Sequence, residues 1–332
     1  MTTRGRIGRW VAIAGALVAV GGLADASQLN TVVLVLMAAQ IGVAWNMLGG
    51  YAGQVSLGHA AFYGLGAYTS TLLLIKLGLS PWFGIPIGGL LAAALSLAFG
   101  WSCFRLKGHY FAMATIAVAE LVQIFFNEWD FGGAAVGLTI PLDQKGWWWL
   151  NFATKQPYYW LALGLLGLTL LTSAWVERSY LGYYFKAIKD EPEAARSVGI
   201  SLTLYKQIAL SLSAFFTAMG GSLYAQKELF IDPGSVLSTT LSIKMALVAI
   251  LGGVGTLWGP VVGAVFLTGI EELTRAWLGG SGRGTDVILY ATLIILISIF
   301  YPQGVLGGWR SFWQQRGTRV PVDSLAEGEP KP

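Results

Sequence analysis

Residues 29–69 read LNTVVLVLMAAQIGVAWNMLGGYAGQVSLGHAAFYGLGAYT and contain no Asp, Glu, Lys or Arg. The first half, residues 29–48, is a mostly apolar run that is long enough to cross a hydrocarbon layer about 30 Å thick as a helix. From Gly49 onward glycine recurs, and each glycine inside a helix costs roughly 1 kcal/mol against alanine. The stretch therefore predicts a membrane-spanning helix followed by a broken one.

The composition of the whole chain extends this interpretation. Of its 332 residues, 55% are hydrophobic and only 11% are charged, and the mean hydropathy is +0.62, whereas about a quarter of the residues in soluble domains are charged. The net charge of +4 fits membrane-flanking Lys and Arg better than nucleic-acid binding. A single cysteine, Cys103, excludes an intrachain disulfide framework and a thiolate metal site. We expect an all-α polytopic membrane protein without a metal site.

Apolar runs separated by charged or turn-rich segments predict about ten transmembrane helices. They cover residues 10–24, 29–48, 60–78, 82–103, 110–127, 157–176, 206–226, 241–258, 260–278 and 286–305. The chain then divides into a basic N-terminal segment with a first helix (1–28), a transmembrane domain (29–310) and a polar tail (311–332) that we expect to be disordered. The N-terminal segment has the layout of a cleavable signal peptide, but an uncleaved first helix is favoured because a second span follows at once.

Lysine and arginine set the expected orientation, because they are enriched in cytoplasmic loops. With the N-terminus inside, all the basic clusters fall on the cytoplasmic side, and so do both termini. The loop of residues 128–156 falls outside, and its Trp147-Trp148-Trp149 run suits the membrane interface. That loop is long enough to hold a half-entering segment or a docking surface.

A compact polar stretch, KDEPEAARSVGI at residues 189–200, interrupts the apolar chain within a predicted cytoplasmic loop of residues 177–206. It predicts a helix of about two turns, with Glu191 as the cap, Pro192 as the first helical residue and Gly199 as the left-handed exit. Charges fit the helix dipole, since Glu193 lies near its start and Arg196 near its end. Small residues could offer a weakly apolar patch to a partner, namely Ala194, Ala195 and Val198. The alternative is an ordinary solvated connector.

The broken segment after Gly49 predicts a translocation path, because free backbone groups in a membrane need protein or water around them. Its polar side chains carry no charge. This suits a path for a zwitterion with an aliphatic side chain, because a fixed charge would trap one end of the zwitterion. The candidate path residues are Gln54, Ser56, Gly58, His59, Tyr63 and Thr69, with Glu120 as the deepest carboxylate of the spans. The alternatives are a close-packed seam of small residues and, for His59, a purely structural hydrogen bond.

Other charged residues in the spans are expected to be structural. Lys244 could extend toward the membrane surface, and Glu271 has the i,i+4 spacing of a local pair with Arg275. A weak internal echo also exists, because Leu48-Gly49-Gly50 and Leu251-Gly252-Gly253 each precede a glycine-broken apolar segment. Interrupted segments at matching places in two halves of a transporter point toward its binding site, although coincidence is the alternative in a glycine-rich chain.

Residues 193–199, EAARSVG, resemble the EAA-x-x-x-G signature of ABC importer permeases, whose short cytoplasmic helix docks into the ATP-hydrolysing subunit. Further segments resemble the LivM-type permease of branched-chain amino acid ABC transporters, in collinear order over most of residues 29–310. They are NMLGGYAGQVSLGHAAFYGLGAYT (46–69), RLKGHYFAMATIAVAELVQ (105–123), SYLGYYFKAIKDEPEAARSVGI (179–200), LGGVGTLWGPVVGA (251–264) and FYPQGVLGG (300–308).

The resemblance implies an ABC importer permease fold in a bacterial inner membrane, transporting branched-chain amino acids. It also implies four partners: a LivH-like second permease, two cytoplasmic ATP-binding subunits and a periplasmic substrate-binding protein. Related permeases serve urea, short amides or other amino acids, so these substrates stay open. A stand-alone secondary transporter or channel is the remaining alternative.

The sequence itself contains no phosphate-binding loop. The glycine-rich GGSGRGTD at residues 279–286 lacks the Lys-Ser/Thr that would hold phosphates and Mg²⁺. We also find no nucleophile and base arranged as in an enzyme. We therefore expect no catalytic site and no cofactor on this chain, with ATP and Mg²⁺ bound by the partner ATPases.

Overall fold

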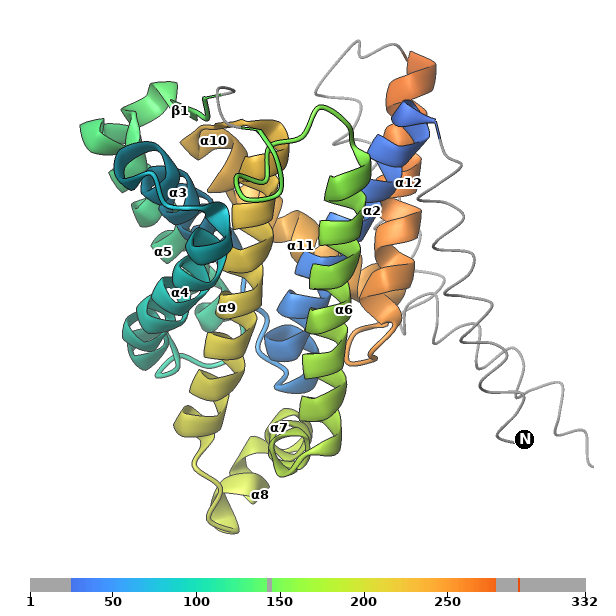
Figure 1. Cartoon of the computed structure of the whole chain (residues 1–332). Helices are drawn as coiled ribbons and strands as arrows, with labels where there is room; N and C mark the ends of the chain where they lie inside the picture. Colours follow the sequence, from blue (N-terminus) through green and yellow to red (C-terminus); the bar gives the residue numbers. More distant parts are fainter. Residues whose placement is uncertain (1–24, 142–144, 279–291, 293–332) are drawn as a thin grey trace, which may run out of the picture.

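The computed structural model describes residues 25–141, 145–278 and Thr292, and these form an α-helical bundle (Figure 1). Seven helical segments within the described residues are long and apolar enough to cross a membrane: 27–51, 59–77, 81–103, 109–128, 156–178, 202–228 and 233–253. The predicted spans at 10–24 and 286–305 lie outside the described residues. Helix α12, Gly259–Leu278, covers the predicted 260–278 span, but its three charged residues exclude it from the seven.

Two groups of helices meet at the long helix α9, Leu202–Glu228. On one side α9 packs against α3 (His59–Leu77) and α4 (Pro81–Cys103), with α5 (His109–Glu128) beyond them. On the other side lies α2 (Ala26–Asn46), which also contacts α6 (Gln156–Arg178), α11 (Thr239–Gly253) and α12 (Figure 1). One cluster of buried side chains fills the α2 side and another the α4 side, and a third cluster, which includes Trp45, Tyr68 and Met245, joins α2 and α11 to α3.

Glycines let α3 and α9 approach closely. A Cβ on Gly66 would lie 2.0 Å from the carbonyl oxygen of Ala218, and a Cβ on Gly221 would lie 2.0 Å from the carbonyl oxygen of Tyr63. The hydroxyl of Ser222 donates to the carbonyl of Gly66 at 2.8 Å across the same interface. Small residues serve this purpose in membranes, where packing rather than water drives helix association.

The predicted break after Gly49 is present. Helix α2 passes into a π-helical turn, η1 (Met47–Tyr51), and residues 52–58 are not helical before α3 begins at His59. A second break, at residues 254–258, separates α11 from α12. It ends the predicted 241–258 span five residues early, because Gly253, the last residue of α11, and Gly255 adopt positive φ angles of 127° and 78° that do not continue a helix.

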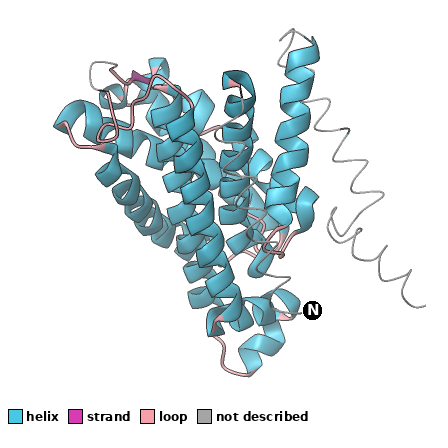
Figure 2. Ribbon diagram, turned by 45° about the vertical axis from the view of Figure 1, so that its right-hand side comes forward, coloured by secondary structure: helices cyan, strands magenta, loops and turns pink. Residues whose placement is uncertain are grey.

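Short elements close one end of the bundle. The loop after α5 holds the 3₁₀ turns η2 (Asp130–Gly132) and η3 (Ala134–Val136) and the strand β1 (Leu138–Thr139), which pairs antiparallel with β2 (Phe230–Ile231). The four-residue helix α10 (Pro233–Val236) follows β2. The described part of this loop forms no half-entering helix, and the strands are confined to that end of the bundle (Figure 2).

The opposite end carries the two short helices α7 (Tyr180–Asp190) and α8 (Pro192–Ser197), which project beyond the long helices (Figure 1). We call residues 180–198 the α7–α8 knob. Helix α7 is anchored by Phe185 and Ile188, both fully buried. Tyr180 and Tyr183 on the same helix are 81% and 70% exposed. The knob is therefore held by one face of α7 and leaves the other face uncovered.

Candidate functional site

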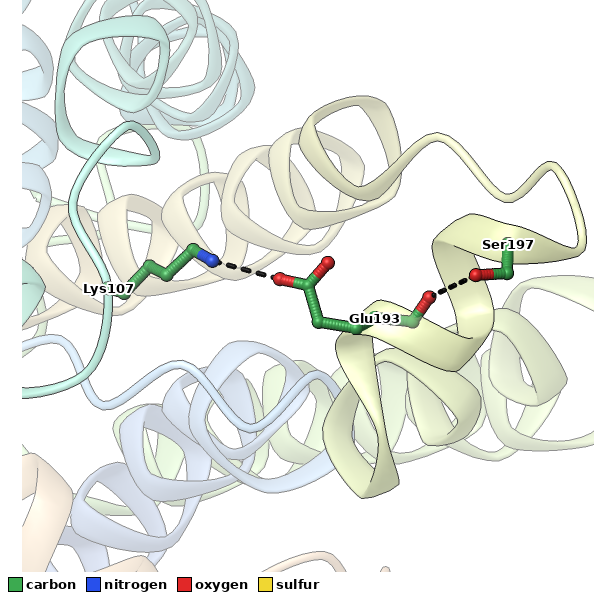
Figure 3. A network of polar contacts seen from close by, with 3 residues as sticks. All are labelled: Lys107, Glu193 and Ser197. Carbon is green, nitrogen blue, oxygen red and sulfur yellow. Dashed lines mark hydrogen bonds and ion pairs between the residues drawn. The ribbon is translucent and has the colours of Figure 1, made fainter.

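The helix α8 forms where the sequence predicts it. Pro192 occupies its first position, and Gly199 leaves it with a φ of 89°. Glu191 stands at the N-cap position, but its side chain makes no capping hydrogen bond, so the predicted side-chain cap is absent. Within the helix, the hydroxyl of Ser197 donates to the carbonyl of Glu193 at 3.0 Å (Figure 3). With six residues, α8 is too short to persist alone and depends on its neighbours.

The small residues of α8 do not share one face, in contrast to the predicted patch. Ala195 is 4% exposed and faces the rest of the chain, whereas Ala194 and Val198 lie at the surface. Val198 is 77% exposed. The uncovered apolar surface of the knob consists of Val198 together with Tyr180 and Tyr183.

A polar contact joins α8 to the turn between α4 and α5. The Lys107 ammonium lies 2.9 Å from the Glu193 carboxylate, and Figure 3 shows the two side chains pointing toward one another. The hydrogen bond and charge of Lys107 lower the pKa of the Glu193 carboxyl below its ordinary value, and Arg196 acts in the same direction. Both side chains are largely exposed, so water screens the pair and it contributes little stability.

A second contact joins α7 to the break after α2. The Lys189 ammonium donates to the carbonyl of Gly50 at 2.9 Å, and the stem of Lys189 covers Gly53, whose φ is 67°. The buried side chain of Phe185 lies in the same apolar cluster as Leu48 and Tyr51. The knob and the broken segment are therefore in direct contact.

The two Leu-Gly-Gly segments that echo each other in the sequence also lie together. The side chain of Asn46 accepts from the amide of Gly255 at 2.9 Å and donates to the carbonyl of Thr256 at 3.1 Å. A Cβ on Gly50 would lie 2.7 Å from the Gly255 amide nitrogen, so only glycine lets the two breaks approach this closely. Lys189 thus connects the knob to the first break, and Asn46 connects the first break to the second.

His59 lies at the centre of a buried hydrogen-bond network. Its Nδ1 is 3.0 Å from the Ser56 hydroxyl and its Nε2 is 2.8 Å from the Ser213 hydroxyl, and the ring is fully buried. Ser213 donates to the carbonyl of Ala44 at 2.7 Å. The Ser213 hydroxyl has one proton, which it donates to Ala44, so it can only accept from His59. We therefore assign the tautomer in which His59 Nε2 donates to Ser213 and Nδ1 accepts from Ser56. This network supports the structural interpretation of His59.

The remaining candidate path residues are not gathered at one place. Gln54 and Thr69 are half-buried, and Gly58 packs against α5, where a Cβ would lie 2.3 Å from the Thr115 carbonyl oxygen. Glu120 is exposed on α5 and accepts a hydrogen bond from the Thr239 hydroxyl, so it is not deep within this chain. Tyr63 alone among these residues lines a large cavity.

Charged residues that we expected to be structural line the same cavity. Lys244 forms an ion pair with Glu271 at 2.5 Å across α11 and α12. The side chain of Arg275, the expected partner of Glu271, lies outside the described residues. Lys227 and Glu228 form a second pair at the end of α9. The sequence signal for this group is the presence of acidic and basic residues near one end of several predicted spans.

Comparisons with known proteins agree on a family. The family described as "Branched-chain amino acid transport system / permease component" matches residues 27–297. The permease protein LivM of the high-affinity branched-chain amino acid transport system of Salmonella typhimurium is 30% identical over 319 residues, covering 89% of this chain and 72% of the relative. The permease protein LivH of the same organism is 25% identical over 297 residues, covering 84% and 94%.

Among solved structures, PsaBC from Streptococcus pneumoniae in complex with Fab is similar with a TM-score of 0.45 and 15% identity. The match covers 87% of this chain and 96% of that chain. A likeness at this level carries no argument about function.

Proposed function

Since this chain belongs to the family of branched-chain amino acid transport permease components, we propose that it is the LivM-like membrane subunit of an ABC importer for branched-chain amino acids. The observation that carries the proposal is the α7–α8 knob. Its EAA-x-x-x-G motif forms a short helix that projects from a bundle of membrane-spanning helices and leaves Val198 uncovered. A surface of this kind suits a separate, ATP-hydrolysing subunit.

The proposed assembly contains four further subunits: a LivH-like permease, two cytoplasmic ATP-binding subunits and a periplasmic substrate-binding protein. ATP and Mg²⁺ bind to the ATP-binding subunits, and this chain carries out no catalysis. The α7–α8 end of the bundle then faces the cytoplasm of a bacterium, as do both chain termini, and the β1–β2 end faces outward across the inner membrane. The placement of Arg105, Lys107 and Lys189 at the α7–α8 end supports this orientation.

The contacts at the knob suggest how a motion would reach the membrane domain. A docked ATPase that moves α8 would also move α7, because only residue 191 separates the two helices. Phe185 and Lys189 would carry that motion to the π-helical turn and the first break, and Asn46 would carry it to the second break. Breaks in helices absorb changes in φ and ψ more easily than continuous helices do. The two broken segments are therefore the proposed moving parts of the path.

Uptake by reconstituted vesicles tests the proposal. Vesicles that contain this chain, a LivH-like permease and both ATPase subunits should concentrate labelled L-leucine when ATP and the binding protein are supplied. The chain alone should not concentrate it under a proton or sodium gradient. Uptake by the isolated chain under such a gradient would instead favour a secondary transporter.

Replacing Lys189 by Met should weaken the connection between the knob and the first break. Lys189 is itself exposed, so water screens this contact and it is worth about 1 kcal/mol or less. We therefore expect ATP-driven uptake to be slower by a few-fold at most, with normal binding of the ATPase subunits. Arg105→Met, which replaces an exposed cation at the same end of the bundle but outside the knob, is the control and should transport normally. Equal uptake by the two variants would show that Lys189 has no role in the connection.

A further inference from the structure

A cavity of about 650 Å³ lies at the end of the bundle opposite the α7–α8 knob. Its walls come from the start of α2, the end of α9, the start of α11 and the end of α12, with Lys155 just before α6. Pockets that bind small molecules in proteins commonly measure about 300–1,000 Å³. The cavity is thus large enough for an amino acid with its water.

The charged lining of this cavity is balanced. Among the residues that the structure describes, three lysines and three glutamates line it, and the formal charges of these six sum to zero: Lys155, Lys227, Lys244, Glu228, Glu271 and Glu272. Lys227 is only 6% exposed and pairs with Glu228. The side chains of Lys244 and Glu271 are 28% and 12% exposed and pair with each other. Buried charged groups are costly unless they are paired, and in membrane proteins they commonly mark functional sites.

One wall of the cavity is apolar. Leu34, Met37, Ala38 and Ile41 line it with the spacing of a single helical face on α2, and Leu241 faces them from α11. The cavity therefore offers charges of both signs beside a surface for an aliphatic side chain. A cation or an anion would need a lining of one sign. Urea or a short amide would need no ionised group at all.

Accepting the proposed function, we propose that this cavity is a binding chamber for zwitterionic aliphatic amino acids on the outer side of the membrane. Lys244 and Lys227 receive the ligand carboxylate, Glu271 receives the ammonium group, and the α2 face receives the side chain. Because Lys244 and Glu271 already pair with each other, the ligand exchanges one ion pair for another. Such an exchange lets the ligand leave again, which a lone buried charge would prevent.

Thiol protection tests the chamber directly, without ATP or the binding protein. In the intact transporter, with the single native Cys103 replaced by Ala, Met37→Cys should react through the cavity with a cationic methanethiosulfonate added from the outside. Millimolar L-leucine should slow this reaction at least about threefold, and isovaleramide, which lacks both charges, should not. Val136→Cys, 82% exposed in η3 at the same end of the bundle, is the control whose reactivity leucine should leave unchanged.

Transport by charge variants gives a second measurement. Lys244→Met and Glu271→Gln should each raise the KM for L-leucine about tenfold or more, because each removes a charged hydrogen-bonding partner, while ATPase content stays normal. Lys76→Met, exposed at the same end of the bundle, should keep the KM of the unmodified protein. A purely structural ion pair would lower abundance and leave KM unchanged.

Thiol protection and leucine uptake together distinguish a failure of the chamber assignment from a failure of the proposed function. If leucine does not protect Met37→Cys, or protects it no better than isovaleramide does, the chamber assignment is overturned even where leucine uptake is normal. If leucine protects Met37→Cys but the unmodified transporter fails to concentrate leucine, the proposed function fails and the chamber stands.

Discussion

Val198→Asp is expected to prevent the ATPase subunits from binding while leaving the membrane domain intact. Val198 is 77% exposed at the end of α8, so its replacement disturbs no packing within this chain. In the proposed assembly the side chain is buried by the partner, and losing the burial of a valine costs about 1.5–3 kcal/mol. An unpaired carboxylate in the interface adds a further desolvation cost. Association should therefore weaken by much more than tenfold.

The variant is best measured by the amount of ATPase that co-purifies with the chain and by ATP-driven leucine uptake. Val136→Asp is a matched control, because Val136 is 82% exposed in η3 at the opposite end of the bundle. It should retain the ATPase subunits. Val198→Leu should also retain them, since the apolar character is kept. Normal ATPase capture by Val198→Asp would remove α8 from the docking surface.

The position of α8 explains why the sequence predicted the helix but not its faces. Pro192 and Gly199 act locally, so its start and end can be read from the chain. Which side of α8 faces outward depends on how α7 is anchored, and Phe185 and Ile188 determine that through contacts with distant segments. No local signal distinguishes Ala195, which is buried, from Ala194, which is exposed. A role for Ala195 in docking remains a prediction. In the structure its side chain is buried against the rest of this chain and is not at the surface.

In the broken segment, too, the local structure could be predicted from the sequence, whereas the contacts with distant segments could not. Its glycines predicted the break after α2, because glycine weakens helices locally. They did not predict that Asn46 would bind the second break some two hundred residues further along the chain, or that Lys189 would reach Gly50. The pairing of Lys244 with Glu271 was missed for the same reason, since the i,i+4 rule considers neighbours on one helix only. Spans and breaks are local properties, whereas the candidate path depends on contacts between helices.

The tight contact between α3 and α9 holds the helix that follows the first break against the longest helix of the described residues. Gly66→Val should therefore destabilise the protein strongly. The new Cβ would lie 2.0 Å from the Ala218 carbonyl oxygen and 2.5 Å from its carbon, and these are backbone atoms that cannot rotate away. Overpacking of this kind costs about 1–3 kcal/mol and sometimes more, and we expect the upper end of that range.

A matched glycine makes this prediction sharp. Gly164 lies within α6 with no atom in reach of an added Cβ, so Gly164→Val should keep or slightly raise stability, since valine is a better helix former than glycine. Unfolding of the purified chain can be followed with a thiol-reactive fluorogenic dye, because its single cysteine, Cys103, is buried until the bundle opens. Gly66→Val should unfold at a clearly lower temperature than Gly164→Val. Equal unfolding temperatures would mean that α3 and α9 can separate at little cost, and then the first break would have no fixed helix to move against.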